Sequence, residues 1–257
     1  MKNYKQIVLI LVLGFVASLK AEIRKFDQAT IEKLGVAIFE QDVRAAAATD
    51  LLFAKKIDPA KEGLRGWVVE GDTKSMLVRF IREKDGVMEA FFDVTFEGTK
   101  RPVIVEPASR MLTSTQAAQY KARALALKGI TRPASRRYNT VVLPDPEREG
   151  FLIYALAATT EPNAVMVGGH YRFSVSKDGL RIENSDELFR SFMVLSTKPK
   201  DLPPGATLAA LSMSTLVSDK PLETHVYPSL LHKMAFYVAT PDGRMWTVEH
   251  GKMKPQE

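Results

Sequence analysis

The sequence contains no cysteine, and this absence excludes several kinds of bond and site. A chain without thiols forms no disulfide, uses no thiolate nucleophile, holds no cysteine-ligated iron–sulfur cluster and offers no sulfur ligand of that kind to zinc. Its stability must come from the packing of its core. A chain of 257 residues is long enough for that, because it buries roughly 70–75% of the surface that its unfolded state exposes.

Motifs of the common enzyme and repeat classes are also missing. No serine stands in a G-x-S-x-G elbow, no glycine pair has the spacing of a nucleotide-binding P-loop, and no histidines have H-E-x-x-H spacing. We find no internal repeat, which excludes solenoids and propellers. The sequence therefore predicts no cofactor, and it leaves open whether the protein is an enzyme.

Residues 1–21 have the pattern of a secretory signal peptide. Two lysines and no acid precede residues 6–19, an uncharged and mainly apolar segment of 14 residues. A helix that crosses a bilayer needs about 20 such residues, so a permanent membrane anchor fits less well. We expect cleavage after Ser18 or after Ala21 and a soluble mature protein that is periplasmic or secreted. It would meet the membrane only through an uncleaved signal segment.

The surplus of positive charge is small once this segment is set aside. The whole chain has a formal net charge of +6, from 36 basic and 30 acidic residues. Residues 1–21 hold three of the lysines and no acid, which leaves 33 basic against 30 acidic residues, or +3. So low a charge does not indicate nucleic acid as a partner.

Hydrophobic periodicity predicts an α+β fold. Apolar residues recur at helical spacing over residues 27–40 and again over 41–56, two stretches that can join as one bent helix. Apolar runs with a period of two follow, and turn dipeptides such as Asp85-Gly86 divide them. This pattern indicates an antiparallel meander over residues 64–105.

The rest of the chain is predicted to be mainly strand. Thr113 begins a T-x-x-Q capping box, which predicts one more helix before a linker. Short β-rich runs then continue to a closing hairpin. Residues 207–234 are assigned only as buried and mixed, apart from a short helix that Pro228 can open. We expect a lobe of helix and meander over residues 22–130 and a larger β-rich lobe over 138–257, as two domains or as one.

One hypothesis for a site rests on the histidines, all four of which lie in the second lobe. His170 follows two glycines, which allow a ligand or the backbone to come close. Glu223 and His225 are two residues apart, so on a strand their side chains would share a face. Together the three would suit zinc or another divalent ion with an open position. The alternative is that the histidines are half-buried and hydrogen-bonded to the backbone.

A second hypothesis rests on residues 121–137, which hold six basic side chains and no acid. Arg132, Arg136 and Arg137 lie on the predicted linker, where a guanidinium can form bidentate pairs with phosphate or carboxylate groups. The partner would be an anionic envelope component or another envelope protein.

Two functions therefore stay open. The first is an exported, non-enzymatic binding or accessory protein that uses the three arginines. The second is a metal-dependent hydrolase outside the cytoplasm that uses the two histidines and the glutamate. An acidic loop at residues 144–150 is typical of a solvated turn and adds no third function.

Overall fold

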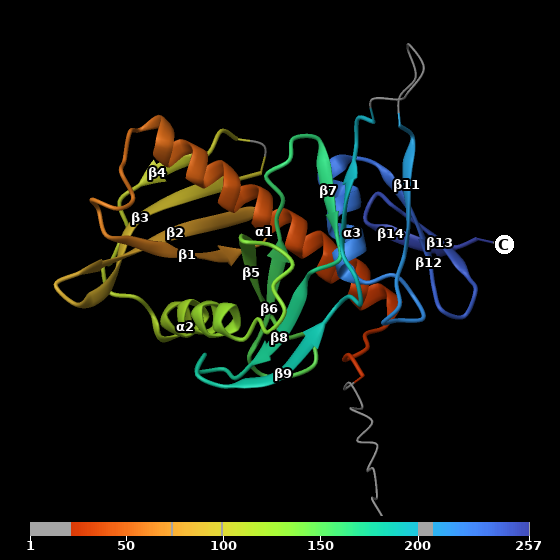
Figure 1. Cartoon of the computed structure of the whole chain (residues 1–257). Helices are drawn as coiled ribbons and strands as arrows, with labels where there is room; N and C mark the ends of the chain where they lie inside the picture. Colours follow the sequence, from red (N-terminus) through yellow and green to blue (C-terminus); the bar gives the residue numbers. More distant parts are fainter. Residues whose placement is uncertain (1–21, 73, 99, 200–207, 257) are drawn as a thin grey trace, which may run out of the picture.

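The computed structural model describes residues 22–72, 74–98, 100–199 and 208–256, so the predicted signal peptide lies outside the described residues. Within them the chain has an α+β fold, as the periodicity predicts, with one long helix at its start and a β-rich C-terminal part (Figure 1). No helix in this part is long and apolar enough to cross a membrane.

The described strands form four sheets. The first is the predicted meander, in the order β1-β2-β3-β4, with strands Leu64–Gly71, Ser75–Lys84, Val87–Glu97 and Val103–Val105. The second, β5-β6-β8-β9, holds Tyr138–Pro144, Phe151–Ala157, Tyr171–Val175 and Ile182–Glu187. A ribbon pairs β7 (Ala164–Val167) with β10 (Met193–Ser196). The last sheet, β11-β12-β13-β14, holds Ala210–Ser214, Ala235–Ala239, Met245–Glu249 and Lys252–Pro255.

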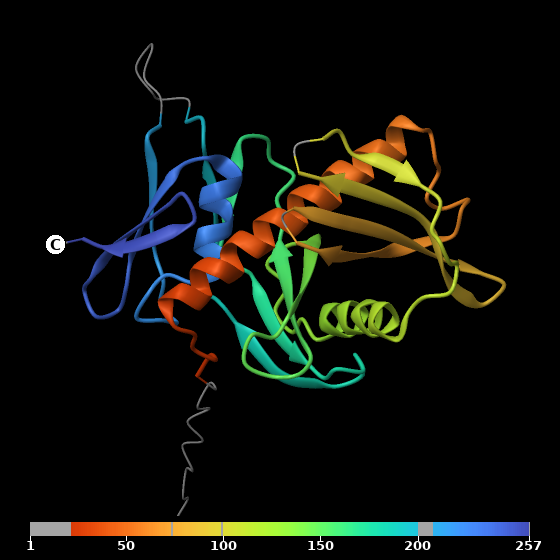
Figure 2. The same ribbon diagram turned by 180° about the vertical axis from the view of Figure 1, so that it is seen from behind.

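Helix α1 (Gln28–Ala54) is continuous where the sequence left open a bend. Asp27 caps it by accepting a hydrogen bond of 2.6 Å from the backbone N–H of Thr30. At 1.5 Å per residue the helix is roughly 40 Å long, and Figures 1 and 2 show it crossing the whole molecule. Its first half packs into the largest apolar core, and its second half packs against the meander.

The turn between β2 and β3 has the geometry that its dipeptide predicts. Asp85 and Gly86 both have positive φ angles, 51° and 78°, and the strands pair directly on either side of them. A two-residue hairpin loop with this backbone matches the right-handed twist of its strands. Helix α2 (Ser114–Lys128) also begins as predicted, with both hydrogen bonds of the capping box between Thr113 and Gln116 present.

Strand β6 is buried along its full length because both of its faces are covered. Phe151, Ile153 and Ala155 pack in the core beneath α2. The residues between them belong to the largest core, which α1 and the last sheet also line. When both faces of a strand are covered, its sequence is a continuous run of apolar residues, because every side chain points to a buried face.

Helix α3 (Glu223–His232) connects the parallel strands β11 and β12. It begins five residues before Pro228, which lies inside the helix and does not open it, so the predicted start is wrong. Glu223 and His225 accordingly lie on the first turn of a helix and not on a strand. The side chain of His225 takes the role of a capping-box residue, because its Nδ1 accepts a hydrogen bond of 2.9 Å from the backbone N–H of Leu222.

The two ends of the described chain meet beside α1. Glu32 accepts hydrogen bonds of 2.9 Å from Lys252 and of 3.1 Å from the backbone N–H of Met253. Gln28 donates a bond of 2.7 Å to the carbonyl oxygen of Met253. Strand β14 thus fixes the first turns of the helix, although more than 200 residues separate them in sequence.

The short segment before α1 is tied to the acidic loop. Arg24 donates hydrogen bonds of 2.8 Å to Asp145 and to Glu147. Asp145 is buried, so the interpretation of this loop as an ordinary solvated turn is wrong for that residue. The carboxylate serves as a counterion for the first residues of the fold.

Candidate functional site

Glu223 belongs to a buried ion cluster around Arg172. The guanidinium of Arg172 donates bonds of 2.6 Å to Glu223 and of 3.0 and 2.7 Å to Asp186, and all three side chains are almost fully enclosed. Tyr154 donates a further bond of 3.0 Å to the same oxygen of Glu223. A buried carboxylate that neutralises a buried cation holds a structural role, since removal of either partner leaves a charge without compensation.

His170 and His225 are buried near one another and are neutral. The Nδ1 of His170 accepts a bond of 3.0 Å from the backbone N–H of Ala157, as the Nδ1 of His225 does from Leu222. Burial lowers the pKa of each histidine from 6.5 to about 4, and repulsion from His225 contributes to the lowering for His170. At neutral pH neither ring carries a charge.

The structure therefore does not bring His170, Glu223 and His225 into one ligand set. The carboxylate is engaged by Arg172, and one ring nitrogen of each histidine is engaged by the backbone. Over the described ranges no group of three or more histidine, aspartate or glutamate side chains is placed to hold a metal ion.

The basic segment divides into buried and exposed parts. Arg123 turns inward, lies 4.1 Å from the ring centre of Trp67 and donates a hydrogen bond to Thr140. Arg132, on the loop after α2, reaches the end of β9, where its guanidinium is 3.6 Å from Glu187 and donates a bond of 3.2 Å to the carbonyl oxygen of Arg190. Within residues 121–137, the exposed arginines lie on the loop that follows α2.

Arg136 and Arg137, on this loop, and Arg190, at the end of a neighbouring one, are exposed. For these three side chains the described structure contains no acidic partner. Arg132 joins the loop to the neighbourhood of Arg190, because its guanidinium also lies 5.3 Å from the ring centre of Phe189. Three unpaired guanidinium groups are thus available on two adjoining segments.

Exposed apolar side chains lie near Arg190, which lines the same hollow as Phe192, Met193 and Leu216. Phe192, Met193 and Leu216 are 49%, 51% and 58% exposed, and Val194 is also open to solvent. Phe192 is joined to Arg132 through Phe189, because the ring centre of Phe189 lies 6.4 Å from that of Phe192 and 5.3 Å from the guanidinium of Arg132. We call this set the docking surface; it consists of Arg132, Arg136, Arg137, Arg190, Phe192, Met193, Val194 and Leu216. A cluster of exposed apolar residues beside unpaired charges is typical of an interaction site.

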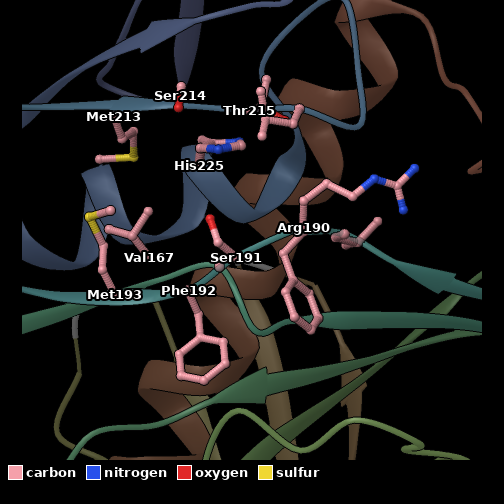
Figure 3. Close-up of a pocket in the computed structure, with 13 residues that line it drawn as sticks. Val167, Arg190, Ser191, Phe192, Met193, Met213, Ser214, Thr215 and His225 are labelled. Atoms are coloured by element: carbon pink, nitrogen blue, oxygen red, sulfur yellow. The ribbon is translucent and has the colours of Figure 1, made fainter.

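A hollow of about 50 Å³ opens within the docking surface. Figure 3 shows Ser191, Met193 and Met213 turned toward it together with His225, whereas Phe192 points away. The hollow lies between β10 and β11. In the described part of the chain β10 pairs only with β7 and β11 only with β12, so each strand keeps one edge without a strand neighbour.

A second cavity, of about 210 Å³, lies where α1, α3 and the ends of β5, β6 and β7 meet. Asp42 and Tyr227 line it, and the tyrosine hydroxyl donates a bond of 2.7 Å to the carboxylate. The Nδ2 of Asn139 donates another of 3.3 Å. Sequence reasoning missed this cluster, because its members come from three elements that are far apart along the chain.

Sequence reasoning also missed Arg190 and the apolar residues after it. Residues 192–195 form one of the short β-rich runs expected after the linker, and successive apolar residues in a strand normally indicate burial on both faces. In the structure β10 is instead exposed over most of its length. The sequence signal for this site is an apolar run directly after an arginine. Such a run does not show which face of the strand a neighbouring element covers.

The chain matches no protein-family model, and the searches of curated proteins and of solved structures find no protein similar to it.

Proposed function

We propose that the protein is an exported, non-enzymatic binding protein that holds an acidic, extended segment of another envelope protein on the docking surface. The observation that carries this proposal is the position of unpaired arginines beside exposed apolar side chains. Arginine forms bidentate pairs with carboxylates, and its weak hydration favours interfaces. Arginine and aromatic residues are also the types that dominate binding energy at protein interfaces.

The backbone edges and the hollow favour a peptide over other anionic partners. Strands β10 and β11 each offer an edge to which an extended segment can add hydrogen bonds. The hollow of about 50 Å³, lined by Met193 and Met213, can take one apolar side chain of that segment. Methionine adapts its shape to such a side chain because it is unbranched and flexible. A lipid surface would use the exposed residues but neither of these features.

Export rests on the pattern of residues 1–21, with its lysines, its 14-residue uncharged segment and its small residues before the cleavage positions. The absence of cysteine suits an oxidising compartment, where a free thiol can mispair. We place the mature protein in the periplasm or outside the cell, with an envelope protein as its partner.

Binding of designed peptides tests the proposal. One fluorescent peptide alternates glutamate and leucine over eight residues, and its matched control alternates lysine and leucine. We expect the acidic peptide alone to bind, with an affinity that falls as salt screens the arginines. The combined variant Arg136→Ala, Arg137→Ala and Arg190→Ala should weaken binding at least tenfold, as measured by fluorescence anisotropy.

The control variant carries Lys55→Ala, Lys61→Ala and Lys84→Ala, which removes the same charge from exposed positions outside the docking surface. It should bind the acidic peptide as the unchanged protein does. Equal losses in both variants would show a general effect of net charge and contradict the proposal. Binding to phosphatidylglycerol vesicles in place of the peptide would contradict it as well, and would assign the surface to lipid.

A further inference from the structure

The cavity beside Asp42 has walls that differ from those of the docking surface. Helix α1 contributes Asp42, strand β5 contributes Asn139, and α3 contributes Tyr227 and His232. The remaining wall is mostly apolar, with Leu156, Val165, Met166 and Leu231 among its residues, and also includes Thr159 and His170. Figure 1 shows α1 passing between β5 and α3, which is how residues so distant in sequence reach one space.

Asp42 is the only carboxylate among the described residues that line this cavity. Of the described residues that line it, none is lysine or arginine. His170 is neutral there because its pKa is about 4, and burial also lowers the pKa of His232. The carboxylate of Asp42 is met by two neutral donors, the hydroxyl of Tyr227 and the amide of Asn139. The ionised form of Asp42 would therefore be hydrogen-bonded, but no described lining residue would neutralise its charge.

Such an arrangement favours a cation as the missing partner. A carboxylate accepts about four hydrogen bonds, and the two donors leave the remaining positions free. Burial raises the pKa of Asp42, which shows that desolvation of the charge outweighs the help of the two donors. A ligand that brings a positive charge and further N–H donors would remove this penalty.

We infer that the cavity binds a small primary ammonium compound, with its charged end on Asp42 and its carbon chain against the apolar wall. A volume of about 210 Å³ exceeds what a few waters need but is below the roughly 300–1,000 Å³ of pockets for drug-sized ligands. A chain of a few carbons is of suitable size. A divalent metal fits less well, because Asp42 is the cavity's only carboxylate.

The inference goes beyond the proposed function, because the two sites share no residue. Strand β7 and helix α3 contribute to both, with Met166 and Tyr227 in the cavity and Val167 and His225 in the hollow. The variant without Arg136, Arg137 and Arg190 should therefore bind the ammonium compound normally. A negative result in one test therefore does not decide the result of the other test.

Titration with n-butylammonium tests the inference, with 1-butanol and butyrate as probes of the same chain length. The side-chain amide of Asn139 is a local reporter in nitrogen-15 NMR spectra, because it donates to Asp42. We expect a saturable shift of this signal with n-butylammonium, no shift with butyrate, and at least tenfold weaker binding in Asp42→Asn. That substitution keeps the size of the side chain and removes its charge.

Asp50→Asn is the matched control, since Asp50 lies on the same helix but is exposed. It should bind as the unchanged protein does. Equal binding of n-butylammonium and 1-butanol would show an apolar cavity without a role for charge and would overturn the inference. So would undiminished binding in Asp42→Asn, or the absence of a saturable shift while the protein's spectrum shows that it is folded. A shift caused by calcium but not by the amine would overturn it too.

Discussion

Acidification should destabilise this protein through His170 and His225, and the structure gives the size of the effect. Both rings have a pKa of about 4 in the folded protein and of 6.5 when they are exposed. The unfolded chain therefore takes up protons first as the pH falls. The contribution of each histidine is complete above pH 6.5, decreases as the pH falls to about 4 and is constant below that.

At about 1.4 kcal/mol for each pKa unit, the difference between 6.5 and about 4 corresponds to about 3 kcal/mol of unfolding free energy for each histidine. Repulsion between the two charged rings is part of the value for His170 alone, so it is counted once when the two contributions are added. Small domains have only about 5–15 kcal/mol in total, so the loss should be large.

Urea unfolding between pH 7.5 and pH 4 measures the effect, and His225→Gln isolates one histidine. Glutamine at this position of a capping box still accepts the backbone N–H of Leu222, but it does not titrate. We expect His225→Gln to have a stability near that of the unchanged protein at pH 7.5 and to lose about 3 kcal/mol less on acidification. Parallel losses in the two proteins would refute the assignment.

Three further predictions concern packing and charge. A Cβ at Gly35 would lie 2.4 Å from the Cβ of Val226, so Gly35→Ala should cost about 1–3 kcal/mol in urea unfolding, and unchanged stability would contradict this close approach of α1 and α3. Arg172→Met leaves two buried carboxylates without their cation, so we expect a loss of about 3–5 kcal/mol in the same assay; a loss under 1 kcal/mol would contradict the role of the cluster. Arg24→Ala removes the pairing with Asp145, so limited proteolysis should cut the segment before α1 sooner, and unchanged cleavage would show that other contacts hold it.

Local sequence signals predicted the parts of the fold that depend on neighbouring residues. The capping box at Thr113 and the turn at Asp85-Gly86 need only a few adjacent residues, and both form as expected. Helix α3 lacks such a signal. Its first residue follows Leu222, whose side chain cannot cap a helix. Pro228 suggests that a helix begins there, but this proline lies in the interior of α3.

The candidate sites depend on contacts that no local pattern contains. Asp42 meets Asn139 across 97 positions and Tyr227 across 185. The histidine hypothesis named two histidines that are buried near one another, yet no sequence pattern shows that Glu223 is already paired with Arg172. Composition identified the basic segment, but only tertiary packing separates Arg123, enclosed beside Trp67, from Arg136 and Arg137 in solvent.

The contact between α1 and β14 can form only late in the synthesis of the chain. A ribosome makes Gln28 and Glu32 long before Lys252 and Met253, so the helix must wait for the last strand before its polar side chains find their partners. Closing so long a loop slows folding. A nascent chain consequently stays incomplete until residues 252–255 are made, and a premature stop near residue 250 would leave the opening turns of the helix without those partners.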